Sequence, residues 1–219
     1  MQQETIKYNK LFLIIIALLA WFAVIMQLYL IIINRKSSLP VTLLQFLSFF
    51  TILTNLLVAI SSSYILLKPN TISGRFFSRP SALTAITLYI VVVGLVYNLI
   101  LRHIWAPQGM QKLVDELLHT VIPALFLIFW ILCVPKQNLQ WTNVFSWLLY
   151  PFIYSLFILI RGAVTGLYPY PFLDVPQLGY STVLINCGYL VLVFLAGALM
   201  FIGAGRLAGS FYNRKPPFG

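Results

Sequence analysis

The segment DELLHTVIPAL, from Asp115 to Leu125, contains one of the two histidines of the chain and two of its four acidic residues. Asp115 precedes His119 by four residues and Glu116 precedes it by three, so on a helix either carboxylate can reach the imidazole across one turn. An imidazole that a carboxylate holds in place can act as a general base. Asp115 is the first choice for this orienting role because a four-residue spacing stacks it over the ring, and Glu116 is the second.

Pro123 follows His119 by four residues. It cannot donate a hydrogen bond to the His119 carbonyl, and its ring presses against that turn, so the sequence predicts a kink in the helix. Inside a membrane, the freed carbonyl is tolerable only where it faces protein or a wet cavity. These residues therefore predict a polar pocket at this end of the helix. The alternative is a histidine that lies at the membrane interface and has no special role.

A second group of polar residues interrupts the apolar segment LQFLSFFTILTNLL. Gln45, Ser48, Thr51 and Asn55 follow one another at spacings of 3, 3 and 4, which predicts a single stripe along one face of a helix. A serine or threonine hydroxyl is a weak nucleophile that a neighbouring base such as His119 can activate. The alternative is helix packing, because Ser, Thr and Asn often hydrogen-bond across membrane helices for modest gains in free energy.

Further polar side chains lie at the edges of apolar runs. Asn98 and Arg102 are one helical turn apart, and either of them, like Asn55, could donate a hydrogen bond to an oxyanion. Arg161 ends another run, where its guanidinium can extend harmlessly to the surface or bind a carboxylate. Asp174 is the only acidic residue after Glu116, and it lies in the loop GLYPYPFLDVPQLGY, whose prolines and aromatic residues predict a stiff cover over this end of the protein.

The elements that must position these residues are membrane helices. Only 8% of the 219 residues are charged and the mean hydropathy is +0.94, which excludes a soluble globular domain. A helix needs about 20 apolar residues to cross the hydrocarbon core. Six such runs, joined by short connections, predict an all-α bundle of six transmembrane helices that forms a single domain over residues 1–219. The runs are approximately Leu11–Ile33, Val41–Leu67, Ser81–Leu101, Glu116–Val134, Asn143–Val164 and Ser181–Gly205.

The basic residues are distributed unequally over the tails and loops. The two tails and the second and fourth loops contain nine of the 14 Lys and Arg residues, and the first, third and fifth loops contain five. The positive-inside rule then predicts that both termini lie in the cytoplasm. The expected localisation is the cell inner membrane, as a multi-pass integral protein. The positive charge favours contact with anionic membrane lipids, whereas the dispersed basic residues match no nucleic-acid-binding fold. Cys133 and Cys187 stand singly in separate runs, so neither a disulfide nor a metal site is expected.

This orientation brings the polar groups toward the outer side of the membrane. The second and fourth runs both enter the membrane from that side. Thr51 is then predicted to lie about 12–15 Å deep at 1.5 Å per residue, with His119 nearer the surface. A tilted helix or a later helix start would bring the two side chains to the same level.

Three segments resemble the hallmark segments of the androgen-induced family of multi-pass membrane proteins: FLSFFTILTNLLVA, LLHTVIPALFLIFW and IRGAVTGLYPYPFLD. The similarity is closest to the compact microbial branch of that family, the Pr-six-Pr membrane proteins. Its most specific part runs from Thr165 to Asp174. Animal members of the family are threonine hydrolases that cleave fatty acid esters of hydroxy fatty acids. The resemblance therefore implies a lipid ester hydrolase inside the membrane, with no cofactor and no metal.

In that family the nucleophile is a threonine two residues after an aromatic residue, and the base is a histidine in a His-Thr…Pro motif. The histidine corresponds to His119, although one residue fewer separates the following threonine and proline in this chain. Thr51 keeps the threonine and the aromatic residue, but it lies four residues before Asn55 where three are usual. Ser48 aligns with the family's threonine position without a gap in the surrounding residues, but it is a serine. Thr51 is therefore the expected nucleophile, and Ser48 is the alternative.

Two other classes of protein fit the same residues. One is a non-catalytic membrane protein that binds, transports or scaffolds lipid, although the chain lacks the inverted repeats and broken helix pairs that are typical of transporters. The other is a redox protein in which His103 and His119 are the two axial ligands of a single haem.

Overall fold

The computed structural model describes the backbone of residues 10–213 and the side chains of residues 10–207. Within that range the chain forms helices joined by short turns and contains no strand, which confirms the all-α fold class. The elements, in chain order, are α1 (Lys10–Ile33), α2 (Leu39–Phe46), α3 (Phe50–Leu67), α4 (Ile72–Phe77), α5 (Pro80–Leu99), the 3-10 turn η1 (Leu101–His103), α6 (Gly109–Glu116), the π-helical turn η2 (Leu117–Val121), α7 (Ile122–Cys133), α8 (Asn143–Thr165), the 3-10 turn η3 (Pro171–Leu173) and α9 (Val175–Asn213).

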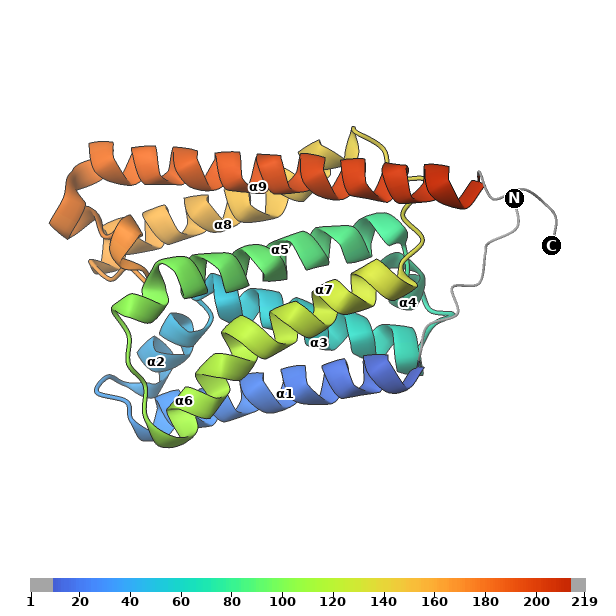
Figure 1. Ribbon diagram of the computed structural model, residues 1–219. Coiled ribbons are helices and arrows are strands. Elements are labelled where there is room, and N and C mark those ends of the chain that lie inside the picture. Colours follow the sequence, from blue (N-terminus) through green and yellow to red (C-terminus); the bar gives the residue numbers. More distant parts are fainter. Residues whose placement is uncertain (1–9, 214–219) are drawn as a thin grey trace.

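Six helical stretches are long and apolar enough to cross a membrane, as the sequence predicts. They are α1, α3, α5 with η1, the continuous stretch from α6 to α7, α8 and α9, and they lie side by side as one bundle (Figure 1). α3 and α5 lie at its centre, because 56% and 67% of their apolar windows are buried, against 17–33% in the other four stretches. These two central helices carry Thr51, Asn55 and Asn98, three of the polar residues that the sequence singles out.

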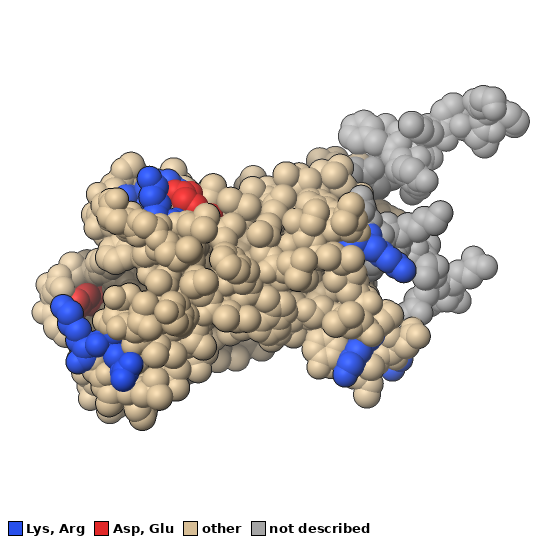
Figure 2. Space-filling view, turned by 90° about the horizontal axis from the view of Figure 1, so that it is seen from below, with Lys and Arg blue, Asp and Glu red and all other residues tan. Residues whose placement is uncertain are grey.

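The bundle has two polar ends and an apolar middle. On the face shown in Figure 2, charged side chains lie only near the two ends, and the band between them is uncharged. This distribution keeps charged groups out of hydrocarbon. α1 begins and α9 ends at the same end of the bundle, and α2, α6 and η3 lie at the opposite end, here called the far end (Figure 1). The charge asymmetry predicts that the far end faces the cell exterior.

Cysteine labelling tests this orientation. In a protein with Cys133 and Cys187 replaced by serine, a single cysteine at the exposed Gln177, at the far end, is expected to react with a membrane-impermeant maleimide in intact cells. A single cysteine at Asn70, in the exposed turn between α3 and α4, is expected to react only after permeabilisation. The reverse pattern would place the far end in the cytoplasm.

The second predicted run, Val41–Leu67, is broken into two helices. α2 and α3 are separated by three residues, of which Phe49 is extended (φ −82°, ψ 122°). Hydrogen bonds of Ser48 stabilise the break: its hydroxyl donates to the Leu44 carbonyl at 2.6 Å, and the Tyr154 hydroxyl of α8 donates to its carbonyl at 2.8 Å. The break contains neither glycine nor proline.

The prediction that Gln45, Ser48, Thr51 and Asn55 form a single stripe on one helix is therefore wrong. Gln45 lies exposed on α2, and Ser48 lies in the break between the two helices. Thr51 and Asn55 remain together on one face of α3, four residues apart, and both are buried. The start of α3 at Phe50 also places Thr51 in the first turn of the helix, at the far end of the bundle.

Pro151 lies inside α8, and α5 compensates for the hydrogen bond that this proline cannot make. The proline has no N–H for the carbonyl four residues earlier, that of Trp147. The Tyr89 hydroxyl of α5 donates to this carbonyl at 2.7 Å. The acceptor therefore faces protein and is satisfied, which allows α8 to continue through the proline.

Pro123 has a similar effect at the far end. Ahead of it the helix takes the π-helical form η2, in which the backbone hydrogen bonds span one extra residue. The carbonyls of Leu118 and His119 thereby lose their usual backbone donors. Asn55 of α3 donates to the Leu118 carbonyl and Asn98 of α5 donates to the His119 carbonyl, each at 3.2 Å. The irregularity that the sequence predicts is thus a π-helical turn, and its freed acceptors face protein.

Candidate functional site

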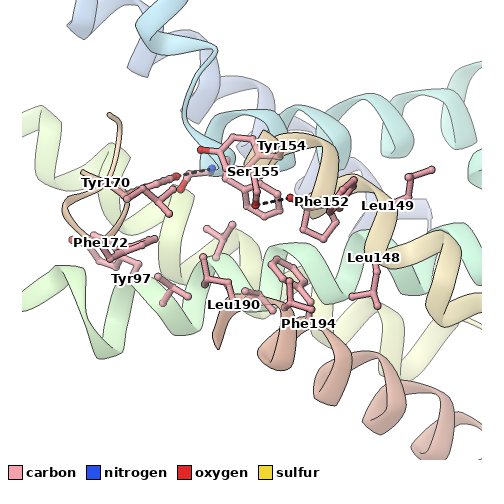
Figure 3. A pocket seen from close by; sticks show the side chains of 18 of the residues that line it. Tyr97, Leu148, Leu149, Phe152, Tyr154, Ser155, Tyr170, Phe172, Leu190 and Phe194 are labelled. Atoms are coloured by element: carbon pink, nitrogen blue, oxygen red, sulfur yellow. Dashed lines mark hydrogen bonds between the residues drawn. The ribbon is translucent and has the colours of Figure 1, made fainter. Parts of the chain in front are cut away.

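A cavity of about 340 Å³ lies between α3, α5, α8 and α9 and ends beneath η3 (Figure 3). Most of its lining is aliphatic or aromatic, as in typical binding sites for apolar ligands. The polar groups in its wall are all hydroxyls, from Thr51, Tyr97, Tyr154, Ser155 and Tyr170. Figure 3 shows that the labelled side chains come from several elements and surround the same space. The cavity therefore suits an acyl chain with a small number of polar atoms.

Thr51 lines this cavity from the first turn of α3. Its N–H donates to the Tyr170 hydroxyl oxygen at 3.4 Å, a bond drawn as a dashed line at Tyr170 in Figure 3. The same hydroxyl also interacts with the Thr51 side chain. Ser48, the alternative nucleophile, is fully buried outside the cavity lining, and its hydroxyl is bound to the Leu44 carbonyl. Of the two candidate hydroxyls, that of Thr51 is the one that a ligand in the cavity can meet.

Tyr170 brings a second hydroxyl to the same point. Its ring stacks on Phe172 of η3, with the centroids 5.2 Å apart and the planes 4° from parallel. Burial raises the pKa of the Tyr170 phenol above its ordinary value, so the hydroxyl keeps its proton. Because the Thr51 N–H donates to the phenol oxygen, the Tyr170 proton can be donated to the Thr51 hydroxyl, to the neighbouring Tyr154 hydroxyl oxygen or to a ligand.

His119 lies in the π-helical turn, with its ring against Tyr97. The two ring centroids are 4.0 Å apart and the planes differ by 15°. His119 Nδ1 lies 2.9 Å from the Asp115 carbonyl oxygen and 3.3 Å from Asp115 Oδ1, and the Tyr97 hydroxyl donates to Asp115 Oδ2. Both neighbours of Nδ1 are acceptors, so that nitrogen carries the proton and Nε2 can accept one. The buried Asp115, 5% exposed, thus holds both rings.

Glu116, the second choice for orienting the imidazole, has another partner. Its carboxylate pairs with the Arg102 guanidinium through two hydrogen bonds of 2.7 Å. Arg102 also donates to the Thr120 hydroxyl at 3.0 Å and lies over the Tyr97 ring, 5.3 Å from its centroid. From the sequence we predict that Arg102 could donate a hydrogen bond to an oxyanion. In this structure its guanidinium instead donates to Glu116 and Thr120.

The two asparagine amides join the central helices to the π-helical turn. Asn55 Nδ2 lies 2.9 Å from the Thr51 carbonyl oxygen and 3.2 Å from that of Leu118. Asn98 Nδ2 likewise donates to a carbonyl of its own helix at 2.8 Å and to that of His119 at 3.2 Å. Both hydrogens of each amide are therefore engaged, and donation to a substrate oxyanion would require one of these bonds to break.

Thr51 and His119 lie in the two turns that this junction connects, and they are not hydrogen-bonded to each other. Asn55 ties the turn that contains Thr51 to the turn that contains His119. Tyr97 lines the cavity together with Thr51 and stacks on His119. The threonine hydroxyl therefore lies in the cavity, and the imidazole lies against one wall of it. A hydroxyl, an imidazole with one free nitrogen and a buried carboxylate are the groups that nucleophilic acyl transfer requires.

Arg161 and Asp174, the last two predicted site residues, are not brought together. Arg161 is only 7% exposed near the end of α8, and its Nη1 donates to the Leu167 carbonyl at 3.2 Å. The Asp174 carboxylate accepts from the backbone N–H of Gln177 at 3.3 Å and from its side chain at 2.7 Å. Asp174 thus caps the start of α9.

Sequence reasoning missed three tyrosines of the site, namely Tyr97, Tyr154 and Tyr170. Tyrosine is common at membrane interfaces, so the presence of Tyr97 and Tyr170 near the ends of apolar runs indicates no particular role. Tyr154 lies in the middle of the run that forms α8, and no charged or amide side chain one helical turn away singles it out. The hydrogen-bond partners of the three tyrosines lie 18, 106 and 119 residues away along the chain. No local spacing therefore marks them.

Comparisons with family models, with curated proteins and with solved structures find no match to this chain.

Proposed function

We propose that this protein is a lipid ester hydrolase of the inner membrane, with Thr51 as the nucleophile and His119 as the general base. Its substrates are fatty-acyl esters such as fatty acid esters of hydroxy fatty acids, as the resemblance to the androgen-induced family implies. One observation carries the proposal. The Thr51 hydroxyl opens into an apolar cavity of about 340 Å³, and the wall of that cavity includes Tyr97, whose ring stacks on His119.

In the first half of the proposed reaction, the Thr51 oxygen attacks the carbonyl carbon of the ester, and its proton passes to His119 Nε2, directly or through one water. Asp115 holds the opposite edge of the imidazole and stabilises its protonated form. The ester carbonyl oxygen becomes an oxyanion. In this proposal the Tyr170 hydroxyl, which burial keeps protonated beside Thr51, donates a hydrogen bond to the oxyanion.

The intermediate then collapses. The bond between the carbonyl carbon and the alcohol oxygen breaks, and the departing alkoxide takes the proton from His119, which leaves an acyl ester on Thr51. In the second half, water attacks this acyl ester and gives a proton to His119. The bond to Thr51 breaks, the threonine oxygen takes that proton back, and a free fatty acid leaves. The protein is regenerated without a cofactor.

A non-catalytic lipid-binding protein is the second candidate. The observation that favours it is the lack of a hydrogen bond between the Thr51 hydroxyl and the His119 imidazole, although the cavity itself suits a lipid. Catalytic hydrogen bonds are often not yet formed before substrate binds, so this geometry is compatible with both candidates.

A turnover experiment separates the two. The purified protein in detergent is incubated with a fatty acid ester of a hydroxy fatty acid, and the released fatty acid is measured by mass spectrometry. We expect turnover, together with covalent labelling of the peptide that contains Thr51 by a fluorophosphonate probe. A folded protein that binds the lipid but neither hydrolyses it nor reacts with the probe would be a lipid-binding protein.

A further inference from the structure

Arg161 is a buried cation without an acidic partner. The structure describes three acidic residues, and each has a different partner: Asp115 binds His119 and Tyr97, Glu116 binds Arg102, and Asp174 binds Gln177. Arg161 is nevertheless only 7% exposed, in a helix that is apolar enough to span a membrane. Buried charges in proteins are normally paired, and within membrane helices they commonly mark a functional site.

The guanidinium has unused hydrogen-bond donors. Its Nη1 donates to the Leu167 carbonyl, whereas its Nε is completely buried and has no acceptor within the described part of the chain. A role in capping the end of α8 explains the bond from Nη1 to the Leu167 carbonyl. It does not explain why the Nε side of the guanidinium is buried without an acceptor. Nε and Nη2 form the fork with which arginine binds a carboxylate or a phosphate through two parallel hydrogen bonds.

Arg161 is not itself part of the cavity lining, but it lies close to the end of the cavity that η3 covers. It lies two helical turns beyond Tyr154 on the buried stripe of α8, about 10 Å further along the axis. Tyr154 lines the cavity and is close enough to Arg161 to interact with it electrostatically. The loop that Arg161 binds through Leu167 leads directly into η3, which covers the cavity. A Cβ on the neighbouring Gly162 would lie 2.0 Å from the Tyr168 ring, so this loop packs on the backbone of α8.

We propose that the cavity takes a lipid with an anionic end, and that the Nε edge of Arg161 binds this end. The alkyl chain occupies the apolar cavity, and the anion supplies the partner that Arg161 lacks in the protein. Carboxylate and phosphate share the chemistry that this fork recognises. The inference rests on the proposed function only in placing a lipid in the cavity, and it does not depend on hydrolysis. It makes Arg161 a specificity-determining residue that selects anionic over neutral lipids.

Binding of three ligands with the same alkyl chain tests this: oleate, oleyl phosphate and neutral oleyl alcohol. None contains a carboxylic ester, so the result is independent of whether the protein is a hydrolase. Dissociation constants are measured on the purified full-length protein in uncharged detergent. We expect at least one anionic ligand to bind ten-fold or more tightly than the alcohol. The tighter of oleate and oleyl phosphate identifies the anion as a carboxylate or a phosphate.

Substitutions of Arg161 test whether this residue causes the preference for anionic over neutral ligands. Arg161→Met is expected to bind the anionic ligands no more tightly than the alcohol, with the alcohol affinity unchanged. Arg35→Met is the matched control, because Arg35 also caps a helix end at the far end, through a 2.9 Å bond to the Ile32 carbonyl, but is exposed. It should keep the parental preference.

Arg161→Gln serves if the methionine variant does not fold, since glutamine keeps a donor for the Leu167 carbonyl but carries no charge. It should lose the preference as well. An unchanged preference for anions in a folded Arg161→Gln or Arg161→Met protein would overturn the proposal, as would equal binding of all three ligands by the parent protein.

Discussion

Alanine in place of Thr51 is expected to abolish ester hydrolysis and fluorophosphonate labelling in a protein that stays folded. The substitution removes the one candidate nucleophile that lines the cavity, so the rate should fall by at least about 10³-fold. The cost in folding free energy should be small, about 0.6 kcal/mol for one hydroxyl inside a membrane bundle. Thr51→Ser keeps a hydroxyl at the same position and should keep measurable turnover.

Two further variants control for this result. Thr87→Ala removes another fully buried threonine hydroxyl, which donates to the Leu83 carbonyl in the middle of α5, and it should leave activity unchanged. Ser48→Ala should also stay active, because the Ser48 hydroxyl is bound to a backbone carbonyl outside the cavity. Parental activity in Thr51→Ala with an inactive Ser48→Ala would make Ser48 the nucleophile. Full activity in both would exclude the proposed mechanism, because neither hydroxyl would then be the nucleophile.

Glutamine in place of His119 is expected to lower turnover by about 10²–10⁴-fold, the usual contribution of a general base. Glutamine keeps hydrogen-bonding atoms near Asp115 but cannot accept the proton of the attacking hydroxyl. Binding of a non-hydrolysable lipid should persist, because His119 lies against the cavity wall and is not part of the cavity lining. Turnover and ligand binding are therefore measured on the same preparation.

His103→Gln is the matched control, since it makes the same chemical change at the other histidine, which is exposed in η1. It should keep parental turnover. If a folded His119→Gln protein hydrolyses the ester at the parental rate, the histidine is structural and the proposed mechanism is wrong.

The sequence by itself determined that the protein folds in a membrane and that its secondary structure is helical. Hydropathy is a property of each residue, and burial in hydrocarbon forces the backbone of every long apolar run to satisfy its hydrogen bonds within the run, as a helix does. Short-range contacts were predictable for the same local reason. Asp115 and His119 are four residues apart on one helix, and Pro123 frees a carbonyl whatever surrounds it.

Tertiary structure decided where the second run breaks. The residues between α2 and α3 include neither glycine nor proline, so hydropathy and helix propensity predict an uninterrupted helix there. The break is stabilised by the hydroxyls of Tyr154 and Tyr170, which bond to the backbone of Ser48 and Thr51 from 106 and 119 residues away. These contacts place Thr51 at the start of a helix, beside a cavity.

Tertiary packing also decided which hydrogen-bond partner each residue of the predicted site has. Sequence spacing indicates that Glu116 and Asp115 can both reach His119. Only the packing of α5 and η1 against the junction of α6 and η2 assigns Glu116 to Arg102 and Asp115 to His119 and Tyr97. The same packing leaves Arg161 without an acidic partner. Local sequence determines which polar groups a helical turn presents. The partner of each group depends on which helices the whole chain brings close to it, because a hydrogen bond forms only when donor and acceptor are within about 3.5 Å.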